Sequence, residues 1–440
     1  MSEIQISRRS SYGPSSPEVG NKGAVTRQRI VDASLKLFGT VGYFNTSVDA
    51  IAQVADVSRA TLYQYFPGKD AIFRELLEAC GKALLRVVRR LGPLGANDVG
   101  FDNLNWWLGE WGWVYEKYAT MFVQWNAVAA TQSDIRTDIA DFHKGYTHRI
   151  AERLRSFDLA DLDSDAAAVA ISALVNRMNF YIHTGRSHGR SVESIADGIS
   201  VHLQLFLFPD TPRTAFEKVR LATSGPSIAD VPGRPSTTGL SVDERTYGLT
   251  TRAAKTVRAL VAAGADQFNS QGYHPTNVDD IVQSAGYARG TFYKYFRDKQ
   301  DLLATLAVET TNSGEALMAQ LPTVDFTDKP ALQSWVTSFI DNTDRYSGLM
   351  VAWTEGVSDC AVAAALGAHM QASLDRALVE VISAQSLYYP SDPVVSALTL
   401  RAALSHVPTA LAESRVLRDR NAKISFVTSM IRRGFLGLSD

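Results

Sequence analysis

The chain is poor in cysteine and lacks long apolar runs, and each shortage excludes a class of protein. Only Cys80 and Cys360 occur among 440 residues, too few for a disulfide framework or a four-ligand zinc site. No run of about 18 apolar residues is present, and the first 21 residues are polar and rich in Ser, so neither a membrane span nor a secretory signal is predicted. We therefore expect a protein of the reduced cytoplasm.

Motifs of catalysis and of metal binding are also missing. His143 and His148 are spaced by five, as are His183 and His188, whereas two ligands on one helical face need a spacing of three or four. The sequence contains no HExxH, no G-x-S-x-G and no phosphate-binding glycine loop. We expect no catalytic residue, no cofactor and no metal site, and we leave open a lone sensor thiol at Cys80.

Charge is present in nearly balanced amounts, but it is not evenly distributed. The net charge of −2 combines +5 over residues 1–90, −5 over 91–245, +2 over 246–306 and −4 over 307–440. Two basic modules, each followed by an acidic one, favour two surfaces that bind a polyanion and two bodies that do not. On charge alone, chance fluctuation explains these small excesses equally well.

An internal repeat organises the chain. A shift of 230 positions aligns residues 31–76 with residues 261–306 without a gap, and 18 of the 46 positions are identical. A weaker similarity at a shift of 228 pairs Tyr118 with Tyr346 and Trp125 with Trp353. Residues 222–242, rich in Gly, Pro, Ser and Thr, have the composition of a linker. The duplication is therefore expected to cover whole halves.

Each copy predicts two short helices joined by a tight turn. Apolar spacing places one helix after Thr46 or Thr276, where Thr-x-x-Asp resembles a capping box. Asp56 and Gly286 follow in the middle of the turn, and both residue types tolerate a left-handed backbone. The next helix runs from about Ser58 to Tyr65 in the first copy.

Helix, turn and helix in this order form the helix-turn-helix, whose second helix can enter the DNA major groove. Arg59 and Arg289 can bind guanine through both guanidinium nitrogens, and the small neighbouring residues permit close approach to the bases. Hydroxyl and lysine side chains nearby suit phosphate oxygens. The predicted DNA-binding residues are Thr46, Ser58, Arg59, Ala60, Thr61, Tyr63, Gln64 and Lys69, and Thr276, Ala288, Arg289, Gly290, Thr291, Tyr293, Lys294 and Lys299.

The segment "TSVDAIAQVADVSRATLYQYFPGKDAIF" closely resembles the DNA-binding signature of the TetR (tetracycline repressor) family of transcriptional regulators, and "TNVDDIVQSAGYARGTFYKYFRDKQDLL" resembles it again. The resemblance covers about 50 residues in each half. It implies an all-α fold of two TetR-like units in tandem, each a three-helix DNA-binding domain followed by a helical ligand-binding and dimerisation body. Asp56 departs from the glycine usual in the family, as Tyr287 and Ala288 depart from a small apolar residue and Ser.

These observations divide the chain into six segments. We expect a disordered arm over 1–22, DNA-binding domains over 23–75 and 246–305, helical bodies over 76–215 and 306–440, and a linker over 216–245.

Aromatic residues concentrate in the predicted bodies. Five of the seven tryptophans lie between residues 106 and 125. A stripe at spacings of three and four on one helix contains Trp107, Trp111, Val114, Tyr118, Met121 and Trp125. Such a stripe is usually core, but it can also line a cavity for the small apolar effector that the resemblance implies. The candidate ligand-binding residues are Trp107, Trp111, Tyr115, Tyr118, Trp125, Tyr146, Phe180, Trp335 and Trp353.

The last apolar stretches of each half predict a pair of long helices, which in the family packs against the same pair of a second subunit. Here the counterpart can lie in the same chain. We therefore expect an intramolecular pseudo-dimer, a regulator and repressor whose unlike DNA-binding domains read an operator with two different half-sites. Two alternatives stay open: a dimer of chains with four DNA-binding domains, and a small-molecule sensor with weakened affinity for double-stranded DNA.

Overall fold

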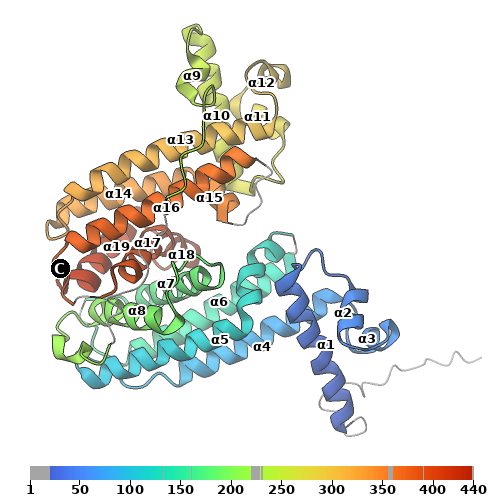
Figure 1. Ribbon diagram of the computed structural model, residues 1–440, viewed down its shortest axis with the longest axis vertical. Helices are drawn as coiled ribbons and strands as arrows, with labels where there is room; N and C mark the ends of the chain where they lie inside the picture. The colour runs from blue at the N-terminus through green and yellow to red at the C-terminus, as the bar shows by residue number, and fades with distance from the viewer. Residues whose placement is uncertain are drawn as a thin grey trace, which may run out of the picture. The chain divides into compact units, whose positions relative to one another are not determined.

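The structure is a computed structural model that describes residues 20–131, 133–159, 161–219, 228, 231–354, 360–389 and 391–438. Every regular element in these ranges is a helix, which confirms the predicted all-α class (Figure 1). Most of the expected N-terminal arm lies outside the described residues, and the first helix already begins at Gly20.

The first half begins with three helices of the predicted DNA-binding domain and continues with longer ones. The elements are α1 (Gly20–Thr40), α2 (Val48–Val54), α3 (Arg59–Tyr65), α4 (Lys69–Arg89), α5 (Asp98–Thr131), α6 (Ser133–Leu154), α7 (Ser164–His183), α8 (Val192–Leu207) and the 3-10 turn η2 (Arg213–Phe216). Non-helical backbone angles at Tyr118 interrupt α5.

The second half repeats this order after the short helix α9 (Val242–Thr246). It contains α10 (Thr251–Gln271), α11 (Val278–Ala285), α12 (Arg289–Tyr295), α13 (Lys299–Gln320), η3 (Leu321–Thr323), α14 (Lys329–Arg345), α15 (Ser347–Thr354), α16 (Ala361–Ala384), α17 (Pro393–Ser405), α18 (Val407–Ser414) and α19 (Arg420–Leu436). The single helix α7 of the first half thus corresponds to two helices, α17 and α18.

The compact units do not coincide with the two halves of the sequence. Unit 1 contains residues 1–92 and 106–156, which include the first predicted DNA-binding domain. Unit 2 contains residues 93–105 and 157–440. The helix pair α7 and α8, although encoded in the first half, therefore folds together with the second half.

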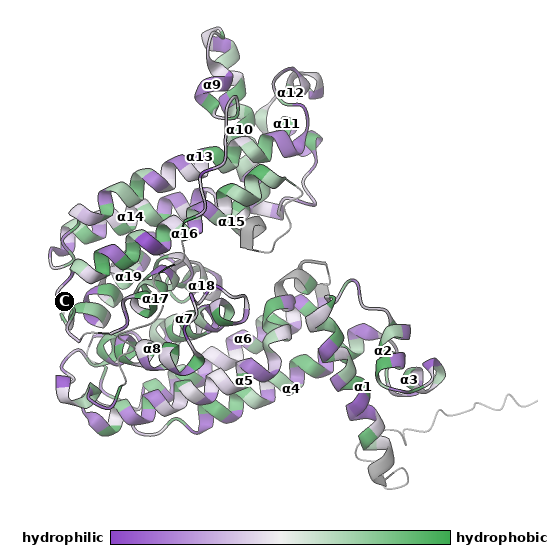
Figure 2. Ribbon diagram, in the orientation of Figure 1, coloured by the Kyte–Doolittle hydropathy of each residue, from purple (hydrophilic) through white to green (hydrophobic). Residues whose placement is uncertain are grey.

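A bundle of helices from both halves forms the centre of unit 2. Helix α8 packs on α19 and α17, and α7 packs on α17 and α18. These helices are rich in hydrophobic residues along their length (Figure 2). Burial of this apolar surface is the main free-energy term that holds the helices together.

Two glycines bring the helices of this bundle close together. A Cβ atom at Gly198 of α8 would overlap the side chain of Val395 on α17. A Cβ atom at Gly434 of α19 would lie 3.0 Å from the carbonyl oxygen of His202 on α8. The absence of a side chain at both positions therefore sets the spacing between the two halves in unit 2.

Helices α17 and α18 also form the one described stretch that is long and apolar enough to cross a membrane, Pro393–Ser414. Most of this stretch, 78%, is buried inside the protein. Its apolar character is explained by these neighbours: α17 packs on both α7 and α8, and α18 packs on α7.

Candidate DNA interface

The first head, defined here as α1 to α3 of the first predicted DNA-binding domain, contains the expected helix-turn-helix. Ser58 caps α3, since its hydroxyl accepts a hydrogen bond from the backbone N–H of Thr61 at 3.0 Å. Asp56, in the turn before it, has a φ of 51°. The left-handed turn expected at this residue is therefore present.

The second head, α10 to α12, reaches the same geometry with different residues. Gly286 has a φ of 74° in the turn. Asn277 and Asp280 form a capping box at the start of α11, because each side chain accepts a hydrogen bond from the backbone N–H of the other. Ala288 precedes α12 without a capping side chain.

The helix-capping role predicted for Thr46 and Thr276 is wrong. The caps of α2 and α11 are the next residues, Ser47 and Asn277. Both threonine side chains are buried, and their hydroxyls donate to the carbonyl oxygens of Gly42 and Gly272 at 2.7 Å. Because these hydroxyl protons are already engaged inside the head, neither threonine can donate to a DNA phosphate in this arrangement. The residues that indicate the true caps in the sequence are Ser47 and Asn277, one position after each threonine.

The remaining residues predicted on α3 and α12 form an open face in each head. Ser58, Arg59, Ala60, Tyr63 and Gln64 are exposed, and Thr61 is half-buried. The second head presents the same pattern at Ala288, Arg289, Gly290, Tyr293 and Lys294, with Thr291 half-buried. Leu62 and Phe292 are fully buried beneath these faces and hold the two helices on their heads.

Arg59 is held by two neighbours rather than extended freely into water. Its Nη1 donates to both carboxylate oxygens of Asp49 at 3.0 and 2.9 Å, and its guanidinium lies 5.6 Å from the Tyr63 ring centre. The Tyr63 hydroxyl and the Asp49 carboxylate raise the pKa of Arg59. Asp49 was expected to take part in helix capping, and its pairing with the arginine across the turn was not anticipated.

The same arrangement recurs in the second head. Arg289 forms an ion pair with Asp279, and its Nη2 donates to the Tyr293 hydroxyl at 3.3 Å. The guanidinium lies 5.8 Å from the Tyr293 ring centre. Two sequences that differ at most positions therefore build the same Asp, Arg and Tyr triad on the exposed face of α3 and of α12.

Lys69 and Lys299 have a structural task inside their heads. The Lys69 ammonium donates to the carbonyl oxygens of Tyr43, Phe44 and Thr46 at 2.9, 3.3 and 3.2 Å. An ammonium has three donors, so all of them are engaged by the loop before α2. The phosphate contact predicted for Lys69 is therefore not supported.

Lys299 repeats these contacts in the second head. It donates to the carbonyl oxygens of Tyr273, His274 and Thr276 at 2.8, 3.2 and 2.7 Å. Burial lowers the pKa of Lys299. The predicted phosphate contact of this lysine is also not supported.

The aromatic stripe of α5 lies within the core of unit 1. Trp107 and Trp111 are fully buried, and Trp107 Nε1 donates to the carbonyl oxygen of Val87 at 3.0 Å. Tyr115 and Tyr118 are buried as well. The side chain of Trp125 lies outside the described residues.

Among the described residues of this core, two buried side-chain polar atoms have no hydrogen-bond partner. They are Trp111 Nε1 and the Tyr146 hydroxyl, and the two rings lie 5.2 Å apart. Burial raises the pKa of Tyr146 well above its ordinary value. Buried polar groups without a partner are rare in folded proteins, and a bound molecule is one way to satisfy them.

The other candidate ligand residues are arranged differently. Phe180 lies on α7 in unit 2, where the guanidinium of Arg177 lies 4.8 Å from its ring centre. Trp335 is buried on α14 and donates to the carbonyl oxygen of Leu317 at 3.1 Å. The side chain of Trp353 lies outside the described residues. Trp335 thus has a partner and fits a core residue.

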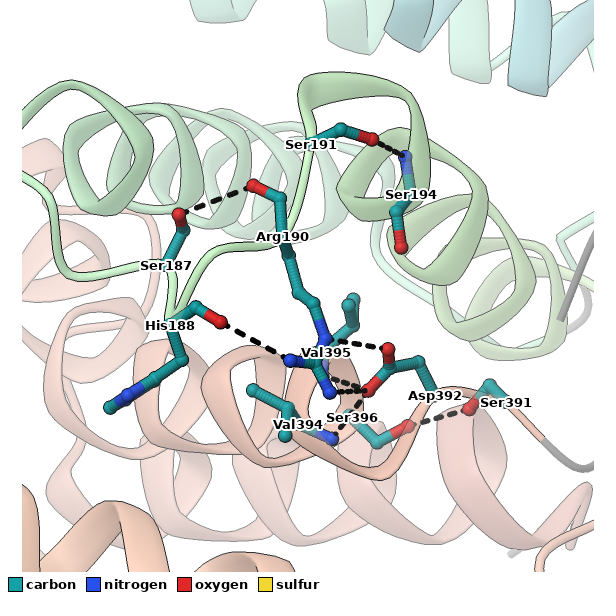
Figure 3. A network of polar contacts seen from close by, with 10 residues as sticks. All are labelled: Ser187, His188, Arg190, Ser191, Ser194, Ser391, Asp392, Val394, Val395 and Ser396. Carbon is teal, nitrogen blue, oxygen red and sulfur yellow. Dashed lines mark hydrogen bonds and ion pairs between the residues drawn. The ribbon is translucent and has the colours of Figure 1, made fainter. Parts of the chain in front are cut away.

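Polar contacts join the helix pairs of the two halves within unit 2 (Figure 3). Arg190 Nε donates to Asp392 Oδ2 at 2.7 Å, and both side chains are buried. His202 on α8 is bonded through Nδ1 to the carbonyl oxygen of Gly434 and through Nε2 to the hydroxyl of Ser396, both at 2.9 Å. Burial lowers the pKa of His202 to about 4, so the ring is neutral at pH 7.

The chain is similar to known bacterial regulators. The sequence profile described as "Bacterial regulatory proteins, tetR family" matches residues 30–76 and again residues 260–306. An uncharacterised HTH-type transcriptional regulator from the dhlA 5′ region of Xanthobacter autotrophicus is 22% identical over 187 residues, which are 42% of this chain and 91% of the relative.

Two further proteins resemble this chain. The HTH-type negative transcriptional regulator IcaR of the biofilm operon icaADBC from Staphylococcus aureus (strain Newman) is 26% identical over 128 residues, which are 29% of this chain and 68% of the relative. A solved structure of a transcriptional regulator from Saccharomonospora viridis in complex with choline is 24% identical, has a TM-score of 0.34, and is matched over 42% of this chain and 95% of its own.

Proposed function

Because the chain is a tandem-duplicated member of the TetR family and a DNA-binding transcriptional regulator, we propose that it acts as a repressor whose two heads bind one operator together. IcaR, a negative regulator, supports repression rather than activation. We place this activity in the cytoplasm, where bacterial DNA lies.

The observation that carries the proposal is the pairing of α7 and α8 with α17, α18 and α19. A helix pair from each half contributes to this bundle, as each subunit does in a symmetric dimer. A single chain can thereby supply both members of a dimer. In this arrangement the two reading helices need not be identical, and in this protein they are not.

The heads differ at the positions that face DNA. Gln64 occupies the place that Lys294 has in the second head. Glutamine suits adenine, whereas lysine suits guanine or a phosphate oxygen. The operator therefore has two unlike half-sites, spaced by about one helical turn of DNA or a multiple of it.

Selection of bound genomic fragments, followed by hydroxyl-radical footprinting, tests this function. The expected footprint has two protected half-sites of different sequence. Arg59→Ala weakens discrimination at one of them and Arg289→Ala at the other, each by about 1 to 3 kcal/mol. A perfect palindrome would contradict the pairing of unlike heads, and the absence of salt-dependent DNA binding would favour a sensor that no longer binds DNA.

The size of the complex is a separate outcome. One chain per operator, measured by light scattering of the protein with its DNA, is expected. Two chains per operator would instead indicate a dimer with four heads.

We also propose that the core around Trp111 and Tyr146 receives a small, mostly apolar effector. The two unpartnered polar atoms support this, since they can orient a guest inside an otherwise apolar site. The effector lowers operator affinity to the extent that it prefers a state in which the heads are wrongly spaced. Tyr146→Phe, which removes one of these atoms, is expected to weaken the effector's action on DNA binding while basal operator affinity stays unchanged.

A further inference from the structure

The segment that connects the halves is not a free linker at its second end. Residues 231–246, here called the strap, lie against the second half and end in helix α9. The composition of this segment predicts flexibility, but its side chains and backbone make specific contacts with α13 and α16. Figure 1 shows it passing along α13 toward α9.

The first set of contacts fixes the beginning of the strap to the body. Arg234 donates to Glu315 and to Asn312, both on α13, at 2.5 Å each. His369 on α16 contacts the carbonyl oxygen of Pro232 through Nδ1 at 2.8 Å and Glu315 through Nε2 at 3.1 Å. Both contacts of the ring are hydrogen bonds only when both nitrogens carry a proton, because each faces an oxygen acceptor.

The second set fixes the end of the strap to the second head. Arg245 Nη2 pairs with Asp301 at the start of α13 at 2.5 Å, and its Nη1 donates to the carbonyl oxygen of Tyr295 at 3.1 Å. The guanidinium lies 4.9 Å from the ring centre of Phe296. Tyr295 is the last residue of α12, so Arg245 holds the C-terminal end of the reading helix.

The ion pair between Arg245 and Asp301 is largely buried, so water screens it less than an exposed ion pair. The side chain of Asp301 is 5% exposed and that of Arg245 is 13% exposed. Burial alone would raise the pKa of Asp301, but hydrogen bonds from the Arg297 amide and from Arg245 bring it below its ordinary value. The carboxylate is therefore charged and paired at neutral pH.

The strap follows α13 in the opposite direction to the helix. Successive strap residues Arg234, Val242 and Arg245 contact α13 at Glu315, Glu309 and Asp301, and the Val242 amide donates to Glu309 at 3.0 Å. Helix α13 joins the second head to its body. The strap therefore spans the same junction and braces it from outside.

The first half does not carry the residues that receive the strap. At the shift of 230, the four α13 residues Asp301, Glu309, Asn312 and Glu315 correspond to Ala71, Ala79, Lys82 and Leu85 of α4. None of these four can accept a hydrogen bond through its side chain. The acceptors are thus specific to the half that the strap reaches.

We propose that the strap fixes the second head on its body, so that Arg234 and Arg245 are positioning residues for the second DNA half-site. The inference rests on the proposed function, in which both heads bind DNA. It adds that the brace acts on the second half-site alone, because the strap contacts only the second half.

Footprint titration of the selected operator with the full chain and its Arg245→Ala variant tests the proposal. Loss of the brace leaves the reading helix in its binding orientation for only part of the time, and the apparent Kd rises by the inverse of that fraction. We expect about a tenfold rise in the Kd of the second half-site, with the first unchanged. Arg289→Ala identifies which half-site the second head reads.

Two control variants separate positioning from general effects. Arg418→Ala removes an exposed arginine of the second body and is expected to change neither half-site. Arg27→Ala removes the guanidinium that lies 4.5 Å from the Phe66 ring centre in the first head, and it is expected to act on the first half-site only. Arg245→Lys, which can still pair with Asp301, should restore part of the loss.

Deuterium uptake of the protein without DNA provides an independent measurement. Faster uptake in α12 of the Arg245→Ala variant, with unchanged uptake in α3, is expected. If Arg245→Ala changes neither the uptake in α12 nor the Kd of the second half-site, the proposal that the strap braces the second head is wrong. Arg289→Ala can leave DNA binding unchanged while Arg245→Ala still raises deuterium uptake in α12. In that case the proposed function fails, but the bracing of the second head by the strap stands.

Discussion

Arg190 and Asp392 form a buried ion pair between the two halves of the chain, although 202 positions separate them in the sequence. Asp392 also caps α17, since its Oδ1 accepts from the backbone N–H groups of Val394 and Val395. One carboxylate thus starts a helix of the second half and receives an arginine from the first. The counterparts of these residues in the other half do not form such a pair. Asp163 corresponds to Asp392, and its described contact is the cap of α7. Arg418 precedes α19 as Arg190 precedes α8, and it is exposed.

Breaking this ion pair on one side should destabilise unit 2. Arg190→Met leaves the Asp392 carboxylate buried without its partner, and a loss of about 3 to 5 kcal/mol in the free energy of unfolding is expected. Urea denaturation followed by circular dichroism measures it. The double variant Arg190→Met with Asp392→Ser removes the buried charge and keeps a capping hydroxyl, so it should be more stable than Arg190→Met alone. Equal losses in both variants would show that the uncompensated charge is not the cause.

The buried His202 predicts a loss of stability in mild acid. Its pKa is about 4 in the folded protein and about 6.5 in the unfolded chain, so between these values the unfolded chain binds more protons. Stability therefore falls as the pH decreases through this window, by about 2 kcal/mol from pH 7 to pH 5 for this residue. Urea denaturation at the two pH values measures the effect.

A variant isolates the share that His202 contributes. His202→Asn is expected to be less stable at pH 7, because the bonds to Gly434 and Ser396 are disturbed, but to lose about 2 kcal/mol less between pH 7 and pH 5. His406, whose pKa burial and Arg177 also lower, remains in the variant and keeps part of the acid sensitivity. An identical pH dependence in both proteins would exclude His202 as a contributor.

The heads could be predicted from the sequence because their signals are local and occur twice. The left-handed residue at Asp56 or Gly286 and the exposed face of each reading helix follow from residue type and helical spacing. The cap was misplaced by one residue because a threonine and its neighbour both suit that position. The choice is made by Gly42 and Gly272, whose carbonyl oxygens accept the threonine hydroxyls.

Contacts between distant residues account for what the sequence did not predict. Lys69 and its three carbonyl acceptors are separated by 23 to 26 positions, and only the folded loop brings the acceptors together. The strap is a similar case, because Gly, Pro and Ser residues predict a flexible chain wherever no side chain anchors it. Arg234 and Arg245 anchor the strap, and the composition of the segment does not show which acceptors on α13 bind them.

Lys69 is expected to affect the stability of its head rather than DNA affinity alone. Lys69→Met removes three hydrogen bonds from a charged donor and leaves the carbonyl oxygens of the loop unpaired, at a cost of about 2 kcal/mol. Deuterium uptake in α2 and thermal unfolding measure the loss. Lys36→Met, at an exposed position of α1, changes the charge equally and should leave both unchanged. Reduced DNA affinity with normal uptake in α2 would instead restore a phosphate contact for Lys69.

Asp49 and Asp279 are expected to determine how selectively the heads bind. Each carboxylate holds an arginine that would otherwise be free to contact any phosphate, and we expect this restraint to direct the guanidinium toward a base edge. Asp49→Asn removes this restraint and one negative charge. Affinity for random DNA should then rise and the salt slope should steepen by about one, while the ratio of operator to random affinity falls about tenfold.

The control for this prediction is Asp32→Asn, which removes the same charge from the exposed side of α1 in the same head. Both variants raise affinity for random DNA if net charge alone is responsible, and the operator ratio then falls equally. A fall confined to Asp49→Asn, and repeated by Asp279→Asn at the other half-site, shows that orientation of the arginine is the cause. Since surface ion pairs contribute little to stability, thermal unfolding should change only slightly in all three variants. We therefore expect the carboxylates to act on the choice of DNA sequence and not on the fold of the heads.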